Sequence, residues 1–223
     1  MKYFPNIKEY YKEQRRTLLE SLSKRGIHDR RILAAMNEIP REIFVSPAQK
    51  GRAYEDSALP IDCSQSISQP YTVAIMTQLL EIQPDDKILE VGTGSGYQAI
   101  LLSIMGARVF SIERIKNLHD SAREVFKKYN FKINSMLGDG TLGWREFSPY
   151  NGIIVTAAAP KIPQLLVNQL AIGGRLVVPI GSKTSQEMYL ITRKNEKETV
   201  ETHSDFFKFV PLIGKDGWKQ DDY

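Results

Sequence analysis

The segment KILEVGTGSGY, residues 87–97, limits the possible folds of this chain more than any other part of it. An apolar run typical of a buried strand leads into a glycine-rich turn, and the turn opens a segment with a helical pattern. Gly92, Gly94 and Gly96 carry no Cβ, so the backbone of this turn can lie directly against a ligand. Strand, glycine turn and helix in this order are typical of open α/β sheets, which bind ligands at the carboxyl ends of their strands.

Strands and helices alternate through the rest of this region. Hydrophobic periodicity predicts helices at 72–82, 97–105, 116–129 and 162–170, and strands at 87–91, 107–112, 132–137, 151–156 and 175–180. Such alternation specifies a parallel sheet with helices on both faces. The last two β segments, 187–193 and 199–209, have no helix between them and are expected to pair antiparallel. We therefore predict an α/β fold with a doubly wound, mostly parallel, Rossmann-like sheet and antiparallel C-terminal strands.

The region before the sheet has a different character. Helices are expected at 6–25 and 29–39, with Asp29 as the cap of the second helix and Pro40 as its end. Residues 47–70 are polar and contain three prolines, and they are too long for a plain connector. A segment of this kind in a compact domain is either functional or a surface excursion, and its composition does not decide between the two.

Length and composition narrow the class of protein. A chain of 223 residues fits one domain, which we divide into a helical N-terminal cover at 1–50, an active-site loop at 51–70 and an α/β core at 71–223. The net charge of +4 is spread along the chain, so nucleic acid is not an expected partner, although a mildly basic surface favours acidic substrates. The single cysteine excludes an intrachain disulfide and favours a reducing compartment. Without a signal-like or membrane-spanning apolar run or a heptad pattern, we expect a cytoplasmic monomer.

The glycine turn has two candidate ligands. A dinucleotide fold uses G-x-G-x-x-G, whereas the third glycine of that pattern is Tyr97 here. Glu90 stands directly before the turn, where a carboxylate would repel a pyrophosphate but could pair with the cationic head group of an amino acid. These two observations favour S-adenosylmethionine.

Two acidic residues further along the sheet support this cofactor. Glu113 ends the second strand, 21 residues after Gly92, where it could accept hydrogen bonds from ribose hydroxyls. Asp139, between Gly138 and Gly140, ends the next strand and could accept a proton of the adenine amino group. Each feature alone could also be a simple turn or a solvated strand end. Together, at the ends of three successive strands, they favour the cofactor and are similar to the general class I methyltransferase pattern.

The irregular stretch carries a more specific resemblance. Residues 53–61 (AYEDSALPI) and 65–74 (QSISQPYTVA) resemble the protein-L-isoaspartate O-methyltransferases, which have a Q-T-I-S-Q-P-like segment before the cofactor loop. The resemblance extends over nearly the whole chain. It also includes REIFV at 41–45, LEVGTGSGY at 89–97, SIER at 111–114, GDG at 138–140, IVTAA at 154–158 and FVPL at 209–212.

This resemblance implies a repair reaction and assigns residues to it. The free α-carboxyl of an L-isoaspartyl residue would be esterified with a methyl group from S-adenosylmethionine, and the ester would then close to a succinimide. The active-site serine of the family corresponds to Ser68, which we expect to orient the carboxylate by a hydrogen bond, and the usual Thr two positions earlier is Ser66 here. No metal is expected. The predicted cofactor-binding residues are Gln65, Ser66, Ile67, Ser68, Val73, Glu90, Gly92, Thr93, Gly94, Ser95, Glu113, Arg114, Asp139 and Gly140.

Three places lie outside these assignments. Thr156 and Ala157 would lie beside the substrate or the methionine moiety. The family often completes its site with a Thr after FVPL, where this chain has Ile213 and Gly214, so that contact stays unassigned. His28 and His203 are expected at the surface.

Two alternatives remain at this stage. A class I methyltransferase could act on RNA or a small molecule, but the amino-methylating versions place Asn/Asp-Pro-Pro-Tyr/Phe after the fourth strand, where this chain has VTAAAP at 155–160. A non-catalytic cofactor-binding protein could share the fold, because fold does not determine function. Loss of Glu90, Glu113 or Ser68 would favour that second alternative, and all three are present.

The Glu113 assignment predicts a binding defect. Glu113→Ala should weaken S-adenosylmethionine binding about tenfold or more, because a hydrogen bond to a charged group contributes roughly 1.5–3 kcal/mol. Isothermal titration would measure the dissociation constant. An unchanged value would show that the ribose contact is misplaced.

Overall fold

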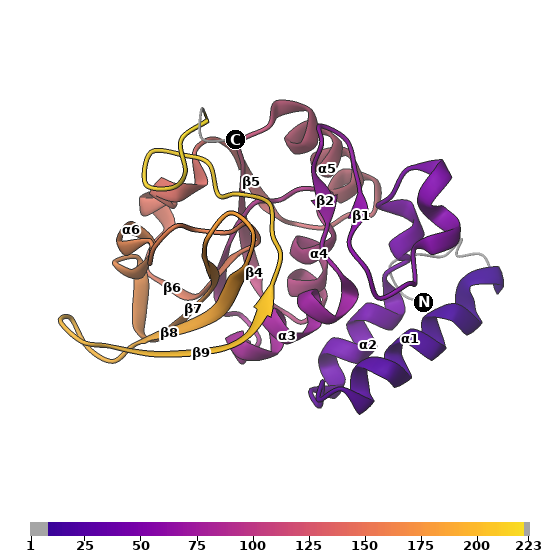
Figure 1. The fold of residues 1–223 in the computed structure, drawn as a ribbon, viewed down its shortest axis with the longest axis horizontal. Helices are drawn as coiled ribbons and strands as arrows, with labels where there is room; N and C mark the ends of the chain where they lie inside the picture. Colours follow the sequence, from indigo (N-terminus) through magenta and orange to yellow (C-terminus); the bar gives the residue numbers. More distant parts are fainter. Residues whose placement is uncertain (1–8, 221–223) are drawn as a thin grey trace.

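A computed structural model describes residues 9–220 and places a seven-stranded sheet at the centre of the molecule (Figure 1). Its strand order is β5-β4-β3-β6-β7-β8-β9. The strands are β3 (Lys87–Val91), β4 (Arg108–Glu113), β5 (Asn134–Leu137), β6 (Tyr150–Val155), β7 (Leu170–Gly181), β8 (Gln186–Arg193) and β9 (Thr199–Phe207).

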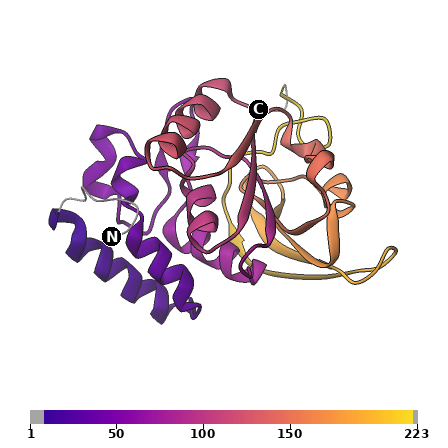
Figure 2. The ribbon, with the colours of Figure 1, turned by 180° about the vertical axis from the view of Figure 1, so that it is seen from behind.

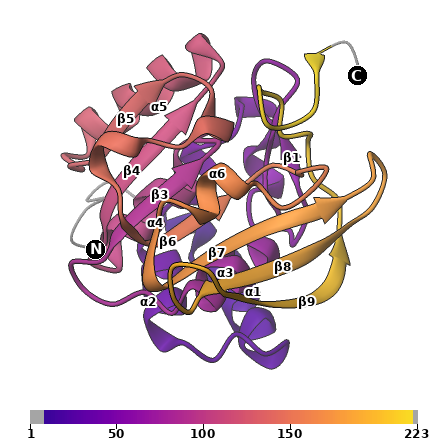
Figure 3. The same cartoon turned by 90° about the vertical axis from the view of Figure 1, so that its left-hand side faces the viewer.

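The sheet is mostly parallel. The five strands from β5 to β7 in the sheet order are parallel to one another, whereas β8 pairs antiparallel with β7 and β9 antiparallel with β8. Figure 3 shows β7 and β8 running side by side, with β9 at the edge. The predicted doubly wound sheet with antiparallel C-terminal strands is confirmed.

The chain reverses its direction across the sheet between β3 and β6. From β3 it proceeds through β4 to β5 at one edge, and it then returns to β6 on the other side of β3. Loops that leave the carboxyl ends of two such neighbouring strands diverge to opposite faces, which opens a crevice between them. The glycine turn follows β3 and Thr156 follows β6, so the sheet topology brings these two segments together.

Apolar cores cover both faces of the sheet, as short strands without polar alternation predict. One core combines strand residues such as Ile88 and Val109 with α3 (Pro70–Leu80), α4 (Tyr97–Ile104) and α5 (Lys116–Lys128). The other contains Leu89 and Phe110 and packs against the 3-10 helix η5 (Arg145–Phe147) and α6 (Gln164–Val167). Helix α6 is much shorter than the expected helix at 162–170, because β7 already begins at Leu170.

The N-terminal helices join the first of these cores. The expected helix at 6–25 begins outside the described residues, and its described part consists of η1 (Glu9–Tyr11) and α1 (Lys12–Lys24). Helix α2 (Arg30–Glu38) begins as predicted, with the Asp29 carboxylate accepting a hydrogen bond from the Arg31 backbone N–H. Two short helices follow, η2 (Arg41–Ile43) and η3 (Pro47–Arg52). Figures 1 and 2 show α1 and α2 at the opposite end of the molecule from the β8–β9 hairpin.

The irregular stretch contains a small hairpin. Strands β1 (Leu59–Pro60) and β2 (Ser66–Ile67) pair antiparallel, and the exposed Cys63 lies in the connecting turn. Helix α3 begins only three residues after the end of β2, so Ser68 and Gln69 are held between a strand and a helix. Within residues 9–220, no helix has the length and apolar character needed to cross a membrane.

Candidate active site

A cavity lies at the carboxyl ends of β3, β4 and β6. The glycine turn, the start of α5, the loop before α3 and the segment 210–213 surround it. Every predicted cofactor-binding residue lines this cavity except Asp139. The fold therefore brings together residues as far apart in the chain as Gln65 and Ile213.

The glycine turn leaves no room for a side chain at position 92. Gly92 has a φ of +98°, and a Cβ there would lie 2.4 Å from the Thr156 hydroxyl. That hydroxyl donates to the carbonyl oxygen of Gly92 at 2.7 Å. Gly96 has a φ of +85° and packs so closely on Phe126 that a Cβ would lie 2.7 Å from the ring. Gly92 is thus needed for the contact of the turn with the end of β6, and Gly96 for the packing of α4 against α5.

Glu113 holds this turn from the neighbouring strand. One carboxylate oxygen accepts a hydrogen bond from the Gly94 N–H at 2.9 Å, and the other accepts one from the Ile115 N–H at 2.9 Å. The side chain is buried and lines the cavity. A carboxylate oxygen can accept more than one hydrogen bond, so these contacts leave capacity for the ribose hydroxyls that the sequence predicts.

Glu90 is a buried acid that forms no ion pair within residues 9–220. Its side chain is 0% exposed, and burial raises its pKa to about 8. One oxygen accepts a hydrogen bond from the Ser111 hydroxyl, whereas Oε1 has no partner within the described chain. Glu90 lines the cavity, so its carboxyl group, which the Ala99 backbone N–H also approaches, lies close to any cationic group bound there. This carboxyl group and the glycine backbone fit the amino-acid end of S-adenosylmethionine.

Asp139 has a different environment from the one expected. Its Oδ1 accepts hydrogen bonds from the backbone N–H and the hydroxyl of Thr141, and its Oδ2 accepts one from the Lys215 N–H at 2.7 Å. Asp139 does not line the cavity, whereas Gly140 does. In this arrangement the carboxylate fastens the C-terminal segment beside the cavity, and the adenine contact stays a prediction.

The loop that carries Ser68 is held by Asp56. Its carboxylate accepts hydrogen bonds from the Tyr71 N–H at 2.8 Å and from the Gln69 side-chain amide at 3.0 Å, and it pairs with Arg25. Asp56 thus satisfies a backbone donor in the first turn of α3 and holds the preceding loop at the same time. The same contacts restrict the position of Ser68.

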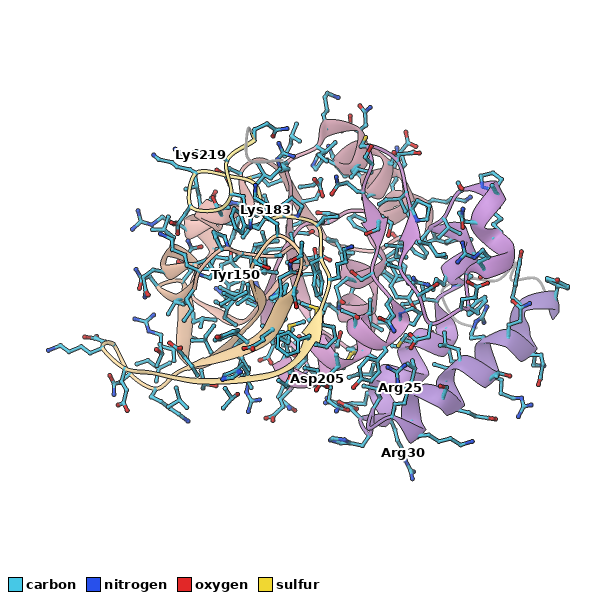
Figure 4. The ribbon with its side chains drawn as sticks, in the orientation of Figure 1. Arg25, Arg30, Tyr150, Lys183, Asp205 and Lys219 are labelled. Carbon is cyan, nitrogen blue, oxygen red and sulfur yellow. The ribbon has the colours of Figure 1, made fainter. Side chains whose placement is uncertain are left out.

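A second, open cleft adjoins the cavity. It lies between the loop before α3 and the end of β9, and its lining includes Arg25, directly after α1, and Asp205 on β9 (Figure 4). Its walls include the exposed ring of Phe206 and the side chain of Lys208. Cavity and cleft share Ser66, Ser68, Thr156 and Val210.

Sequence reasoning missed part of the cavity wall. Met76 and Leu118 line it, and neither was assigned to the site from the sequence. The segment 210–213 also lines it, and the FVPL motif was the available signal there. The histidines lie elsewhere: His119 is buried on α5 without lining the cavity, and His28 and His203 are exposed as predicted. Within residues 9–220, no three His, Cys, Asp or Glu side chains are grouped to hold a metal.

Comparison with known proteins identifies the family. The family model described as protein-L-isoaspartate(D-aspartate) O-methyltransferase matches residues 13–217. The chain belongs to this family. A protein-L-isoaspartate O-methyltransferase of Salinibacter ruber is 49% identical over 95% of this chain and 96% of its own length. A relative of the same name from Syntrophobacter fumaroxidans is also 49% identical, over 94% of this chain and 98% of its own length.

Solved structures agree. One protein-L-isoaspartate O-methyltransferase has a TM-score of 0.81 at 30% identity and covers 91% of this chain and 67% of its own. A Plasmodium falciparum structure described by the same activity, in complex with S-adenosyl-L-homocysteine, has a TM-score of 0.78 at 26% identity over 88% of this chain and 97% of its own. The chain is an S-adenosylmethionine-dependent carboxyl methyltransferase, and this prediction is confirmed.

The environment of Glu90 predicts that cofactor binding depends on pH. Below about pH 8 the buried carboxyl is protonated and must ionise to pair with a cation, so affinity should rise as the pH increases from about 6 to 8 and then level off. Titration of S-adenosylhomocysteine in buffers of different ionisation enthalpy would detect the released proton. Glu90→Gln should bind more weakly at pH 8 and lose the pH dependence. The same slope in this variant would assign the proton to another group.

Proposed function

We propose that this enzyme esterifies the free α-carboxyl of L-isoaspartyl residues in damaged proteins and peptides, which begins their repair. One observation carries the proposal: Ser66, Ser68, Thr156 and Val210 line the cofactor cavity and the open cleft at once. A carboxylate held at these shared residues would lie where the two spaces meet. An open cleft with an aromatic rim suits a peptide better than a small molecule.

The reaction demands little acid–base chemistry. An α-carboxyl has a pKa of about 3.5, so it is already an ionised nucleophile at neutral pH. The absence of histidine from the described lining of the cavity is compatible with this demand. When bound, S-adenosylmethionine supplies an electrophilic methyl group on a sulfonium. The task left for the chain is to align the carboxylate and exclude water.

Two hydroxyl groups are placed for this task. Thr156 already donates to the Gly92 carbonyl, so we assign it to the support of the glycine turn. The hydroxyls of Ser66 and Ser68 have no hydrogen-bond partner within residues 9–220, and both residues face cavity and cleft. We assign Ser68 as the donor that orients the acceptor carboxylate, with Ser66 beside it. A neutral donor fixes the carboxylate without quenching its nucleophilicity as a paired cation would.

We also propose that the enzyme acts as a cytoplasmic monomer, without nucleic acid or membrane. The net charge of +4 is spread along the chain, and the exposed free thiol of Cys63 suits a reducing compartment. Light scattering coupled to gel filtration would determine the oligomeric state. A stable dimer would overturn that part of the proposal.

A matched pair of peptides tests the reaction itself. We expect label from S-adenosylmethionine to enter a peptide with isoaspartate and not the same peptide with normal aspartate. The label should be base-labile, as a methyl ester is. Equal labelling of both peptides, or base-stable label, would contradict carboxyl methylation of isoaspartate.

Ser68→Ala tests the orienting donor. Loss of a hydrogen bond to a carboxylate should lower kcat/KM for the isoaspartyl peptide about ten- to hundredfold. The dissociation constant of S-adenosylhomocysteine should stay nearly unchanged. Ser121→Ala, the same chemical change on the exposed face of α5, should match the native enzyme. Unchanged turnover in Ser68→Ala would remove this hydroxyl from the mechanism.

A further inference from the structure

Arg41, in the short helix η2, is a buried cation whose pKa is lowered by burial and only partly restored by the Asp56 carboxylate. It is 1% exposed, and its guanidinium forms no ion pair within residues 9–220. One terminal nitrogen, Nη2, donates to the carbonyl oxygen of Ser68 at 2.7 Å. The other two nitrogens, Nε and Nη1, are buried and have no hydrogen-bond partner among the described residues.

Another arginine of the N-terminal region shows how such a group is normally stabilised. Arg15 is also 1% exposed, but it donates to the Tyr54 hydroxyl at 2.7 and 3.0 Å and to the Asn37 carbonyl at 3.0 Å. The Glu42 carboxylate lies 3.9 Å from the Arg15 guanidinium and accepts a hydrogen bond from Tyr54. Removing a charge from water is unfavourable unless partners compensate, so Arg15 is compensated and Arg41 largely is not.

The place of Arg41 indicates what its unfavourable burial serves. Its guanidinium lies over the ring of Tyr97, 5.2 Å from the centroid, and Phe44 from the following residues of the chain packs edge-on against the same ring at 5.2 Å. Tyr97 is the first residue of α4, directly after the glycine turn. Ser68 and Tyr97 both line the cofactor cavity. Arg41 thus contacts both the loop that carries Ser68 and the residue that follows the glycine turn.

We propose that Arg41 is a positioning residue for methyl transfer. Its hydrogen bond to the Ser68 carbonyl holds the Ser68 hydroxyl toward the cleft, and its uncompensated positive charge behind that loop favours binding of the acceptor carboxylate. Arginine stays protonated at any physiological pH, so the charge is permanent. The proposal rests on the proposed function, because the group that it favours is the carboxylate of the isoaspartyl residue.

Three variants test this role. Arg41→Met removes the charge and the hydrogen bond, and Arg41→Lys keeps the charge without the planar fork. Arg15→Met is the control for removing an equally buried arginine. For each we would measure KM and kcat with the isoaspartyl peptide, the dissociation constant of S-adenosylhomocysteine and the melting temperature.

We expect Arg41→Met to lower kcat/KM about ten- to hundredfold, mainly through KM, since a hydrogen bond to a charged group is lost. Its affinity for S-adenosylhomocysteine should stay close to the native value, and its melting temperature should not fall, because an uncompensated buried charge is removed. Arg41→Lys should lie between the native enzyme and Arg41→Met. Arg15→Met should melt at lower temperature, since it leaves Glu42 buried without a cation, and its folded fraction should keep native KM and kcat.

The outcomes separate this role from a purely structural one. An Arg41→Met enzyme with native KM and a lowered melting temperature would overturn the proposal. Should Arg41→Met fail to fold, Arg41→Lys decides: KM raised about threefold or more with unchanged cofactor affinity supports the role, and native constants overturn it. Combining Arg41→Met with Ser68→Ala should cost less than the sum of the single changes, because the two act on one contact. Full additivity would contradict positioning through Ser68. Failure of the native enzyme to methylate the isoaspartyl peptide would instead refute the proposed function.

Discussion

The contact between Gly92 and Thr156 joins the two strands at which the sheet reverses its order. The threonine hydroxyl donates to the carbonyls of Val91 and Gly92, and the space it occupies would be filled by any Cβ at position 92. This contact joins β3 and β6 at their carboxyl ends and restricts the backbone conformation of the glycine turn. On the neighbouring strand, Glu113 then accepts a hydrogen bond from the Gly94 N–H. The cofactor cavity is the space that this arrangement leaves open.

Segments distant in sequence complete the site around this point. The loop before α3 forms the wall between cavity and cleft, and Asp56 holds that loop through Gln69 and Tyr71. On another side the segment 210–213 closes the cavity, and Asp139 fastens the residues that follow it through the Lys215 N–H. Two of these three contacts are to backbone N–H groups, which suits a reaction whose main demand is alignment.

Two buried ionisable groups of opposite kind lie around this loop and its neighbouring strand. Glu90, with a raised pKa, lines the cavity, and Arg41 lies behind the Ser68 loop with two unpartnered nitrogens. Among the described residues neither forms an ion pair: Glu90 avoids a buried charge by staying protonated below about pH 8, whereas the buried charge of Arg41 lowers stability. Each would be compensated by a ligand of opposite charge, a cationic amino-acid group for Glu90 and a carboxylate for Arg41. Binding of these ligands would therefore offset part of the desolvation free energy that the burial of Glu90 and Arg41 costs.

Much of the fold and the site can be predicted from the sequence because the signals are local. Apolar periodicity predicts strands and helices, and the residues at strand ends follow directly, so Glu90, the glycine turn and Glu113 are assigned from neighbouring residues alone. The QSISQP segment marks the loop of Ser68 in the same way. What local patterns cannot show is which side chains meet across the chain. Asp139 has the position of a ligand-binding acid in sequence, yet the C-terminal segment folds back onto its carboxylate.

Arg41 is the clearest example of the same limit. In sequence it opens the REIFV segment at 41–45, which resembles the family but assigns no role to Arg41, and only tertiary packing brings it to Ser68 and Tyr97, 27 residues and farther along the chain. The sequence by itself determined the fold class, the cofactor loop and the family. The tertiary structure alone decided which charges are buried without partners, because desolvation depends on everything that packs around a group, and periodicity does not encode that.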